Sequence, residues 1–342
     1  MGEDSKSDST LKPLVLVTGG LGFLGYKTCL FILESGYRVL SVSRKENQQE
    51  LPEGMRHLSI DITKFEELDK INDELVAVIH VAAITGIWGD KKVYERINVK
   101  GTENILSFCR KRNIQNLVYT SSPSVVFDGK DQEMDDESLP YPETYLCDYS
   151  RTKAEAERKV LEANSSSLKT VALRPHLIWG KGDPHLIPKL LDSYRKGRLK
   201  IIGEGLNKVD MVHVDNAAWA HVDALEMLKT NGEGSGKAYF ITNDEPVLMW
   251  EWFNNLLKEL GEKPMQKKVS EKLAYVVGAL CEGVYKLCGK QDDPPMTRFV
   301  ARQLATHHTY SIAAAKRDLK YHIRRSMSDG VEELINSLKK NG

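Results

Sequence analysis

Residues 18–25 read TGGLGFLG, and this stretch decides the fold. It follows an apolar run at 13–18 that is typical of a buried parallel strand, and it precedes helical apolar spacing over 24–35. Glycines at this spacing permit a tight turn, close approach of the backbone to a pyrophosphate, and close packing of helix on strand. Unpaired N–H groups at the helix start favour phosphate oxygens. The stretch therefore predicts a dinucleotide-binding turn; the alternative is a glycine-rich turn that binds no ligand.

Strand-like and helix-like segments alternate from this turn to Pro175. The expected strands are 13–18, 37–43, 57–60, 76–82, 117–121 and 169–173, and the expected helices are 24–35, 98–112 and 149–163. Such alternation predicts an α/β fold of the Rossmann type, a doubly wound parallel sheet that binds ligands beyond the carboxyl ends of its strands. After Pro175 the loops lengthen, which indicates a smaller C-terminal lobe.

The chain therefore divides into three parts. Residues 1–11 are polar and predict a disordered tail. Residues 12–175 are expected to form the nucleotide-binding Rossmann domain. Residues 176–342 are expected to form mostly a substrate-binding lobe with C-terminal helices.

Composition excludes some classes of partner. Lys+Arg and Asp+Glu both total 48, so no basic field indicates nucleic-acid binding. Five scattered cysteines, in no zinc-site spacing, favour free thiols in a reducing compartment, and we predict a cytoplasmic protein without a metal site. Residues 273–288 are apolar but interrupted by Glu282 and Lys286, which predicts an amphipathic helix packed on its own protein. The alternatives are a membrane-surface helix and a substrate lid.

The end of the second expected strand bears on the choice of cofactor. Enzymes that use NAD place an acidic residue about 20 positions after the glycine turn, where it bonds the adenine ribose. This chain has Ser43, Arg44 and Lys45 there. Arg44 can pair bidentately with a 2′-phosphate and Lys45 adds charge, so the sequence favours NADP(H) over NAD(H). The alternative is a solvated pair of surface cations.

A tyrosine and a lysine one helical turn apart, Tyr149 and Lys153, open the helix after the fifth expected strand. A nearby ammonium favours the phenolate and lowers the pKa of a tyrosine, so the pair could relay a proton to or from a substrate oxygen. The spacing alone is common by chance, and its position after the strand end favours the catalytic interpretation. We expect Ser122, rather than Ser121, to hydrogen-bond the same oxygen.

These motifs together resemble a known family. The extended short-chain dehydrogenases are matched by TGGLGFLG at 18–25, NVKGT at 98–102, YTSSPSVVF at 119–127 and YSRTK at 149–153. The 3β-hydroxysteroid dehydrogenase/isomerase branch is matched by LRPH at 173–176, VHVDN at 212–216 and ITNDEP at 241–246. The resemblance covers about residues 12–335.

The resemblance implies a role for each matching residue. Tyr149 would be the acid/base, Lys153 its partner and a contact of the nicotinamide ribose, and Ser122 the group that orients the carbonyl. Together with the residues at the end of the second strand, which are expected near the adenine ribose, the expected cofactor contacts are Gly19, Gly22, Phe23, Leu24, Gly25, Ser43, Arg44, Lys45, Asp61, Ile62, Ala82, Ala83, Tyr149, Lys153, Pro175 and Ile178.

The resemblance also implies an oxidoreductase that interconverts a secondary alcohol and a ketone, and a homodimer. Its nearest branches act on sterol 4α-carboxylates or on 2-alkyl-3-oxo acids, so the expected substrate is a small hydrophobic 3-hydroxy or 3-oxo compound of 3β-hydroxysteroid or 2-alkyl-3-oxo acid type. His176, His185 and Lys208 are candidate contacts for a substrate carboxylate. Structural or surface roles are the alternative for each.

Two rival functions share these features. A nucleotide-sugar epimerase or dehydratase could use the same fold and similar machinery. Such enzymes usually carry an Arg where this chain has Val209, which argues against a diphosphate handle. A non-catalytic NADP-sensing protein is the second rival, and the intact set of Ser122, Tyr149 and Lys153 argues against it.

Overall fold

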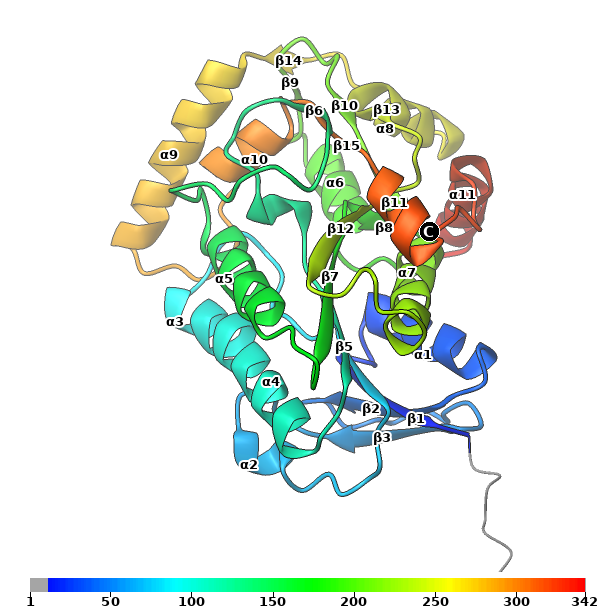
Figure 1. Ribbon diagram of the computed structural model, residues 1–342. Helices are drawn as coiled ribbons and strands as arrows, with labels where there is room; N and C mark the ends of the chain where they lie inside the picture. Colours follow the sequence, from blue (N-terminus) through cyan, green and yellow to red (C-terminus); the bar gives the residue numbers. More distant parts are fainter. Residues whose placement is uncertain (1–11, 342) are drawn as a thin grey trace, which may run out of the picture.

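The computed structural model describes residues 12–341, so the tail predicted at 1–11 lies outside the described residues. Its centre is a parallel sheet of seven strands in the order β12-β7-β5-β4-β1-β2-β3 (Figure 1). The strands are β1 (Leu14–Thr18), β2 (Arg38–Ser43), β3 (Met55–Ser59), β4 (Ala77–His80), β5 (Asn116–Thr120), β7 (Lys169–Pro175) and β12 (Lys237–Ile241). The strand order reverses between β1 and β4, and ligands of open α/β sheets bind at such a switch point. The predicted Rossmann-type fold is confirmed.

Strand β1 shows why its sequence is apolar throughout. Val15 and Val17 lie in the core on one side of the sheet, and Leu14 and Leu16 lie in the core on the other. Successive strand residues point to opposite faces, and helices cover both faces of a parallel sheet, so every position is buried. The covering helices are α1 (Phe23–Glu34) and α7 (Val214–Lys229) on one face, and α4 (Gly101–Lys111) and α5 (Asp148–Glu162) on the other (Figure 1).

Two elements of the Rossmann layers come from beyond residue 175. Strand β12 pairs in parallel with β7, with Ile241 opposite Pro175. Helix α7 packs on α1, where the rings of Phe31 and Trp219 stack with their centroids 4.6 Å apart. The sequence boundary at residue 175 is therefore not a boundary in space, and the assignment of 176–342 to substrate binding stays a prediction.

The rest of the C-terminal part forms a smaller lobe with its own core, which includes Trp179, Trp250 and Phe253. A sheet of order β13-β10-β15-β6 and the pairs β11-β8 and β14-β9 cross this lobe. Its strands are β6 (Gln132–Asp135), β8 (Ile178–Trp179), β9 (Ile201–Ile202), β10 (Lys208–Val209), β11 (Val212–His213), β13 (Val247–Leu248), β14 (Lys268–Val269) and β15 (His308–Tyr310). Its helices are α6 (Leu186–Arg195), α8 (Met249–Glu259), α9 (Glu271–Leu287), α10 (Arg298–Gln303) and α11 (Met327–Asn341).

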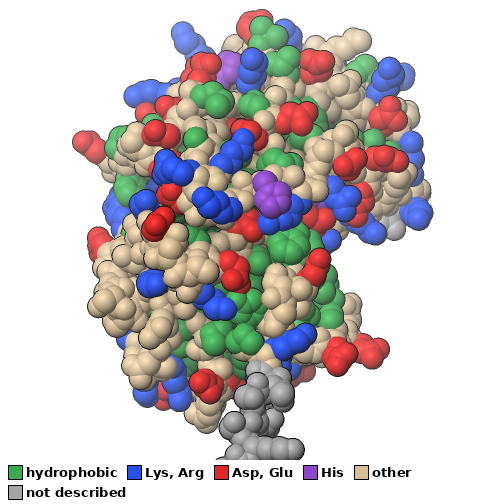
Figure 2. Space-filling model, turned by 45° about the vertical axis from the view of Figure 1, so that its right-hand side comes forward, with side chains coloured by type: hydrophobic (Ala, Val, Ile, Leu, Met, Phe, Trp, Pro, Cys, Tyr) green, Lys and Arg blue, Asp and Glu red, His purple; other side chains and the backbone are tan. Residues whose placement is uncertain are grey.

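Short helical segments complete the chain. They are α2 (Phe65–Leu68), α3 (Lys91–Tyr94), the π-helical turns Glu95–Lys100 and Ala315–Leu319, and the 3₁₀ turn Pro123–Val125. On the face drawn in Figure 2, acidic and basic side chains are interspersed, in keeping with a net charge of zero.

Helix α9 occupies the apolar segment predicted at 273–288. Its inner face packs on the chain, where a Cβ added at Gly278 would lie 2.6 Å from the Thr297 backbone. Its outer face exposes large apolar side chains, namely Leu273, Val276, Val277, Leu280, Val284 and Leu287. The helix is therefore packed on its own protein along one face only, and contact of the other face with a membrane stays a prediction. Between residues 12 and 341, no helix is long and apolar enough to cross a bilayer.

Candidate active site

The glycine turn between β1 and α1 leaves no room for side chains. Gly19 has a φ of +70°, and a Cβ there would lie 3.0 Å from the backbone of Ala82. A Cβ at Gly25 would lie 2.1 Å from the Gly19 carbonyl oxygen. Helix α1 begins at Phe23, and no side chain caps the N–H groups of its first turn. A backbone cradle of this kind, with uncapped donors, fits the pyrophosphate of a dinucleotide.

The loop after β2 presents two cations beside this turn. The Arg44 and Lys45 carbonyls are held from β3, where the Ser59 hydroxyl donates to Arg44 O (3.1 Å) and His57 Nε2 lies 2.9 Å from Lys45 O. The side chains of Arg44 and Lys45 are exposed, and neither forms an ion pair with another residue in 12–341. Both charges are thus available to a ligand, and Ser43 brings no competing carboxylate.

The predicted adenine contacts follow β3. The Asp61 carboxylate accepts a hydrogen bond from the Thr63 N–H at 3.0 Å. The Ile62 side chain is buried against Gly101, where an added Cβ would lie 2.9 Å from it. The Ile62 carbonyl accepts from the Asn104 amide at 2.8 Å. These contacts fix the loop at the carboxyl end of β3, on the same sheet edge as the glycine turn.

A buried polar chain fixes the loop after β4, which carries Ala82 and Ala83. The Ala82 N–H donates to the Thr18 hydroxyl at 3.1 Å, and that hydroxyl lies 2.7 Å from His80 Nδ1. The other ring nitrogen of His80 lies 3.0 Å from the Thr102 hydroxyl. Burial, aided by the charge of Lys153, lowers the pKa of His80 to about 3. His80 is therefore a neutral positioning residue that sequence reasoning missed, since one histidine in an apolar strand gives no signal of its partners.

Tyr149 and Ser122 lie together at the start of α5. A hydrogen bond from Ser122 favours the Tyr149 phenolate, whereas burial opposes it more strongly and raises the pKa of Tyr149 to about 12. The Ser122 hydroxyl also contacts the Ser124 hydroxyl at 3.0 Å. The Ser121 hydroxyl is buried without a partner in the described chain. Of the two serines, the contacts favour Ser122 as the one that acts with Tyr149, and Ser124 is a neighbour that sequence reasoning missed.

The expected effect of Lys153 on the pKa of Tyr149 stays a prediction. The Lys153 ammonium donates to the Thr120 carbonyl at 2.5 Å and lies 4.2 Å from the centroid of the Tyr119 ring. Burial, opposed by the hydrogen bond with Ser122, raises the pKa of Tyr149 to about 12. Burial lowers the pKa of Lys153 itself to about 7, against the charge of Glu157. Tyr149 is consequently a protonated phenol at neutral pH and can donate a proton.

The three candidate carboxylate contacts lie on separate elements. His176 follows Pro175 at the end of β7, and its Nε2 lies 2.7 Å from Nδ1 of His308. Burial lowers the pKa of His176, so its ring is neutral and offers no positive charge. This contact favours the structural alternative for His176. His185 precedes α6 and Lys208 lies in β10, and both are exposed; their role in substrate binding stays a prediction.

The turn between β7 and β8 carries the last predicted cofactor contacts. Pro175 ends β7, opposite Ile241 of β12, and Ile178 begins β8. Leu177 between them has a φ of +42°, an uncommon backbone conformation for a residue with a side chain. The turn is thus held in one shape at the carboxyl edge of the sheet, where it could cover a nicotinamide.

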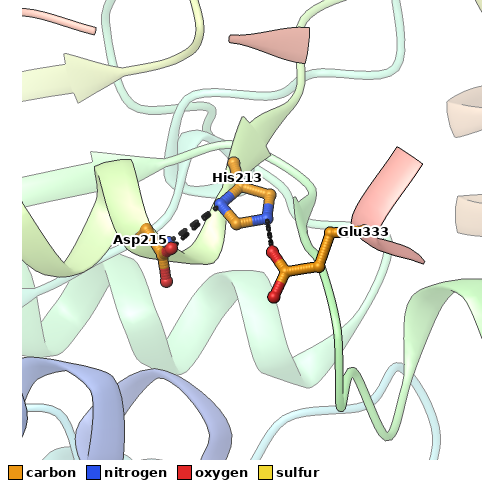
Figure 3. A group of neighbouring side chains, drawn as sticks. All are labelled: His213, Asp215 and Glu333. Atoms are coloured by element: carbon orange, nitrogen blue, oxygen red, sulfur yellow. Dashed lines mark hydrogen bonds and ion pairs between the residues drawn. The ribbon is translucent and has the colours of Figure 1, made fainter. Parts of the chain in front are cut away.

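A second polar cluster consists of His213, Asp215 and Glu333 (Figure 3). Their ligand atoms lie within 4.8 Å of one another, close enough to meet at one cation. However, Asp215 already pairs with Lys27 (2.9 Å) and Arg325 (3.6 Å), and His213 Nδ1 accepts the Asp215 N–H at the start of α7. The Nε2 proton then faces Glu333, 3.9 Å away. These contacts favour a helix cap with ion pairs over a metal centre.

The fold and the glycine turn at its carboxyl edge are those of a dinucleotide-binding enzyme. Residues 16–271 match the 3-beta hydroxysteroid dehydrogenase/isomerase family, and the chain belongs to that family. It is accordingly a nicotinamide-nucleotide-dependent oxidoreductase.

Relatives support this assignment over nearly the whole chain. The chain is 43% identical to a 2-alkyl-3-oxoalkanoate reductase of Shewanella oneidensis, with 94% of this chain and 85% of the relative covered. It is 42% identical to a protein of the same name from Stenotrophomonas maltophilia, with 94% and 98% covered. It is 33% identical to the sterol-4-alpha-carboxylate 3-dehydrogenase, decarboxylating, of Mus musculus, with 94% and 90% covered.

Solved structures confirm the fold. A UDP-glucuronic acid 4-epimerase from Bacillus cereus in complex with NAD superimposes with a TM-score of 0.72 at 21% identity, covering 96% of this chain and 99% of the other. The structure named gox2253 gives a TM-score of 0.78 at 23% identity, covering 97% and 99%. At these identities the likeness shows the fold alone.

Proposed function

We propose that this enzyme is an NADP(H)-dependent reductase of 3-oxo acids with a large apolar body, 2-alkyl-3-oxo acids in particular, and catalyses the reverse oxidation of the 3-hydroxy acids. The substrate class is supported by the two bacterial relatives at 43% and 42% identity, both named 2-alkyl-3-oxoalkanoate reductase. The observation that carries the proposed proton transfer is the Tyr149 phenol beside Ser122 at the start of α5.

The preference for NADP(H) rests on the loop after β2. Arg44 and Lys45 are exposed and unpaired within residues 12–341, and no acid stands at Ser43 to repel a phosphate. A guanidinium and an ammonium in these positions favour a 2′-phosphate over a free 2′-hydroxyl.

The side chains at the strand ends divide the work of reduction. When bound, the reduced nicotinamide nucleotide would be the source of the hydride for the carbonyl carbon. Tyr149 donates its phenolic proton to the oxygen of that carbonyl, and Ser122 hydrogen-bonds the same oxygen. The Lys153 ammonium offsets the negative charge left on Tyr149.

A screen of NADPH consumption tests the proposal. Wild-type protein is given a 2-alkyl-3-oxo acid, a 3-oxosteroid and a UDP-sugar in parallel, with the cofactor followed at its absorbance maximum. The 2-alkyl-3-oxo acid should give the highest kcat/KM. A higher kcat/KM for the 3-oxosteroid would instead favour a substrate of the sterol type.

Activity on a UDP-sugar, or UDP that co-purifies with the protein, would favour the epimerase alternative instead. Val209 cannot bind the diphosphate of a UDP-sugar, because its apolar side chain is fully buried in the core of the smaller lobe. The sensing alternative would gain support if the Tyr149→Phe variant kept the full biological activity of the protein.

A further inference from the structure

A cavity of about 250 Å³ opens beside the start of α5. Cys147 and Asp148, which directly precede Tyr149, form part of its wall. Tyr94 lines the same cavity. The cavity therefore borders the first residues of the helix that carries Tyr149.

Aromatic rings line this cavity among charged and polar side chains. Trp88 comes from the loop after β4 and Tyr285 from the end of α9, and their rings meet edge to face with centroids 6.2 Å apart. The Trp88 indole N–H donates to the Lys290 carbonyl at 3.1 Å, which ties the loop to the segment after α9. These two rings give the cavity an apolar patch that can contact hydrocarbon.

The charges that line the cavity do not balance. Glu282 pairs with Arg298 at 2.7 Å, and Asp148 pairs with Arg151 at 3.0 Å. Lys286 and Lys290 line the cavity and are exposed, and neither forms an ion pair within residues 12–341.

The two lysines lie against the aromatic walls. The Lys286 ammonium lies 5.9 Å from the Trp88 ring centroid, and the Lys290 ammonium lies 5.1 Å from the Tyr285 centroid. A lysine stem of four carbons lets each ammonium move from a ring to an incoming anion. The cavity therefore combines a patch of aromatic rings with two mobile positive charges, a combination that suits an anionic group attached to an apolar body.

We propose that Lys286 and Lys290 form an anion subsite that selects substrates by their carboxylate. The inference deepens the proposed function and rests on it: the carboxylate would bind at these lysines while the neighbouring carbonyl meets Tyr149. The subsite makes the lysines specificity-determining residues, and they take no part in proton or hydride transfer.

The test compares an acid with its neutral analogue. Binding of 2-hexyldecanoate and of 2-hexyldecanol to the protein with NADP⁺ is measured by calorimetry for wild type and for Lys286→Ala/Lys290→Ala. Wild type should bind the acid about tenfold tighter than the alcohol, as expected for two exposed charge pairs, and the double variant should bind both alike. Lys286→Arg/Lys290→Arg should restore the preference for the acid. Lys272→Ala, an exposed lysine on the same helix, is the matched control and should change nothing.

Turnover separates this inference from the function on which it rests. Oxidation of a 2-alkyl-3-hydroxy acid and of the matching neutral secondary alcohol is followed with NADP⁺. KM for the acid alone should rise in the double variant, with kcat nearly kept. Equal changes for acid and alcohol, or retained preference for the acid in the binding experiment, would overturn the subsite. Selective acid binding without turnover of either substrate would uphold the subsite and refute the proposed reaction.

Discussion

The carboxyl edge of the sheet and the cavity beside α9 are built in opposite ways. At the edge, each functional group comes from a short motif, 18–25 for the cradle and 149–153 for the phenol and ammonium. The cavity is assembled from the loop after β4, the residues before α5, and the end of α9, which are far apart in sequence. The glycine turn and Lys153 at the edge are also tightly packed, whereas the lysines of the cavity are exposed. This difference indicates that short sequence motifs supply the groups proposed for the reaction. The groups proposed to select the substrate come together only in the tertiary fold.

Replacing the phenol should give the largest effect. Tyr149→Phe removes the proton donor but keeps the ring, so turnover should fall by about 10²-fold or more. The affinity for NADPH, measured by fluorescence titration, should be nearly kept, because the change lies away from the glycine turn. Unaltered turnover would refute the role of Tyr149. It would also remove the reason to assign the chemistry to the sheet edge and the selectivity to the cavity.

A methyl group added to the glycine turn should have the next largest effect, a loss of cofactor affinity. In Gly25→Ala the new Cβ would lie 2.1 Å from the Gly19 carbonyl oxygen, so the turn must shift. Affinity for NADPH should fall roughly 10- to 100-fold, as expected for overpacking of a tight site. Gly283→Ala is the control, since its Cβ enters open space on α9. Equal affinity in both variants would show that the glycine turn tolerates a side chain at position 25.

Charge reversal after β2 tests the cofactor preference. Arg44→Asp exchanges attraction for repulsion at a 2′-phosphate, and the ratio of kcat/KM for NADPH over NADH should fall roughly tenfold or more. Arg198→Asp makes the same change at an exposed position of the smaller lobe and should leave the ratio alone. A ratio that does not respond to Arg44→Asp would remove Arg44 from the cofactor site.

The acidity of the buried lysine predicts a pH dependence. Burial lowers the pKa of Lys153 from 10.5 to about 7, so the ammonium is present below that pH and is lost as the pH rises through it. Because reduction needs the ammonium after Tyr149 has given up its proton, kcat/KM should decline above pH 7, up to about tenfold per pH unit. A Lys153→Met variant should be slower and lack this limb. A flat profile for wild type from pH 7 to 9 would contradict the assignment.

The smallest effect is expected on the outer face of α9. Leu280 is 64% exposed, so Leu280→Gln should change the free energy of unfolding by less than about 0.5 kcal/mol in chemical denaturation. The same change at Ile79, which is fully buried in the sheet, should cost several times more. A large loss at Leu280 would show that this face is covered in solution, by a second copy for example.

The edge could be predicted from sequence because its signals are local. The glycines of 18–25 have one common structural use after a strand, and the phenol and ammonium share a helix face through their spacing alone. The direction of the pKa shift at Tyr149 could not be predicted, because it depends on burial by segments that the motif does not contain. Lys286 and Lys290 could not be singled out from sequence for the same reason. The acidic residues near them, Asp148 and Glu282, pair with other cations, and the sequence does not show that pairing.

Strand β12 has a consequence for how this protein is made. Once residue 175 has left the ribosome, six strands of the central sheet and both members of the Tyr149–Lys153 pair have been synthesised, yet the free edge of β7 has no partner until residues 237–241 emerge. Exposed strand edges invite pairing with other chains. Synthesis therefore passes through a stretch of more than sixty residues in which the nascent sheet needs protection from aggregation.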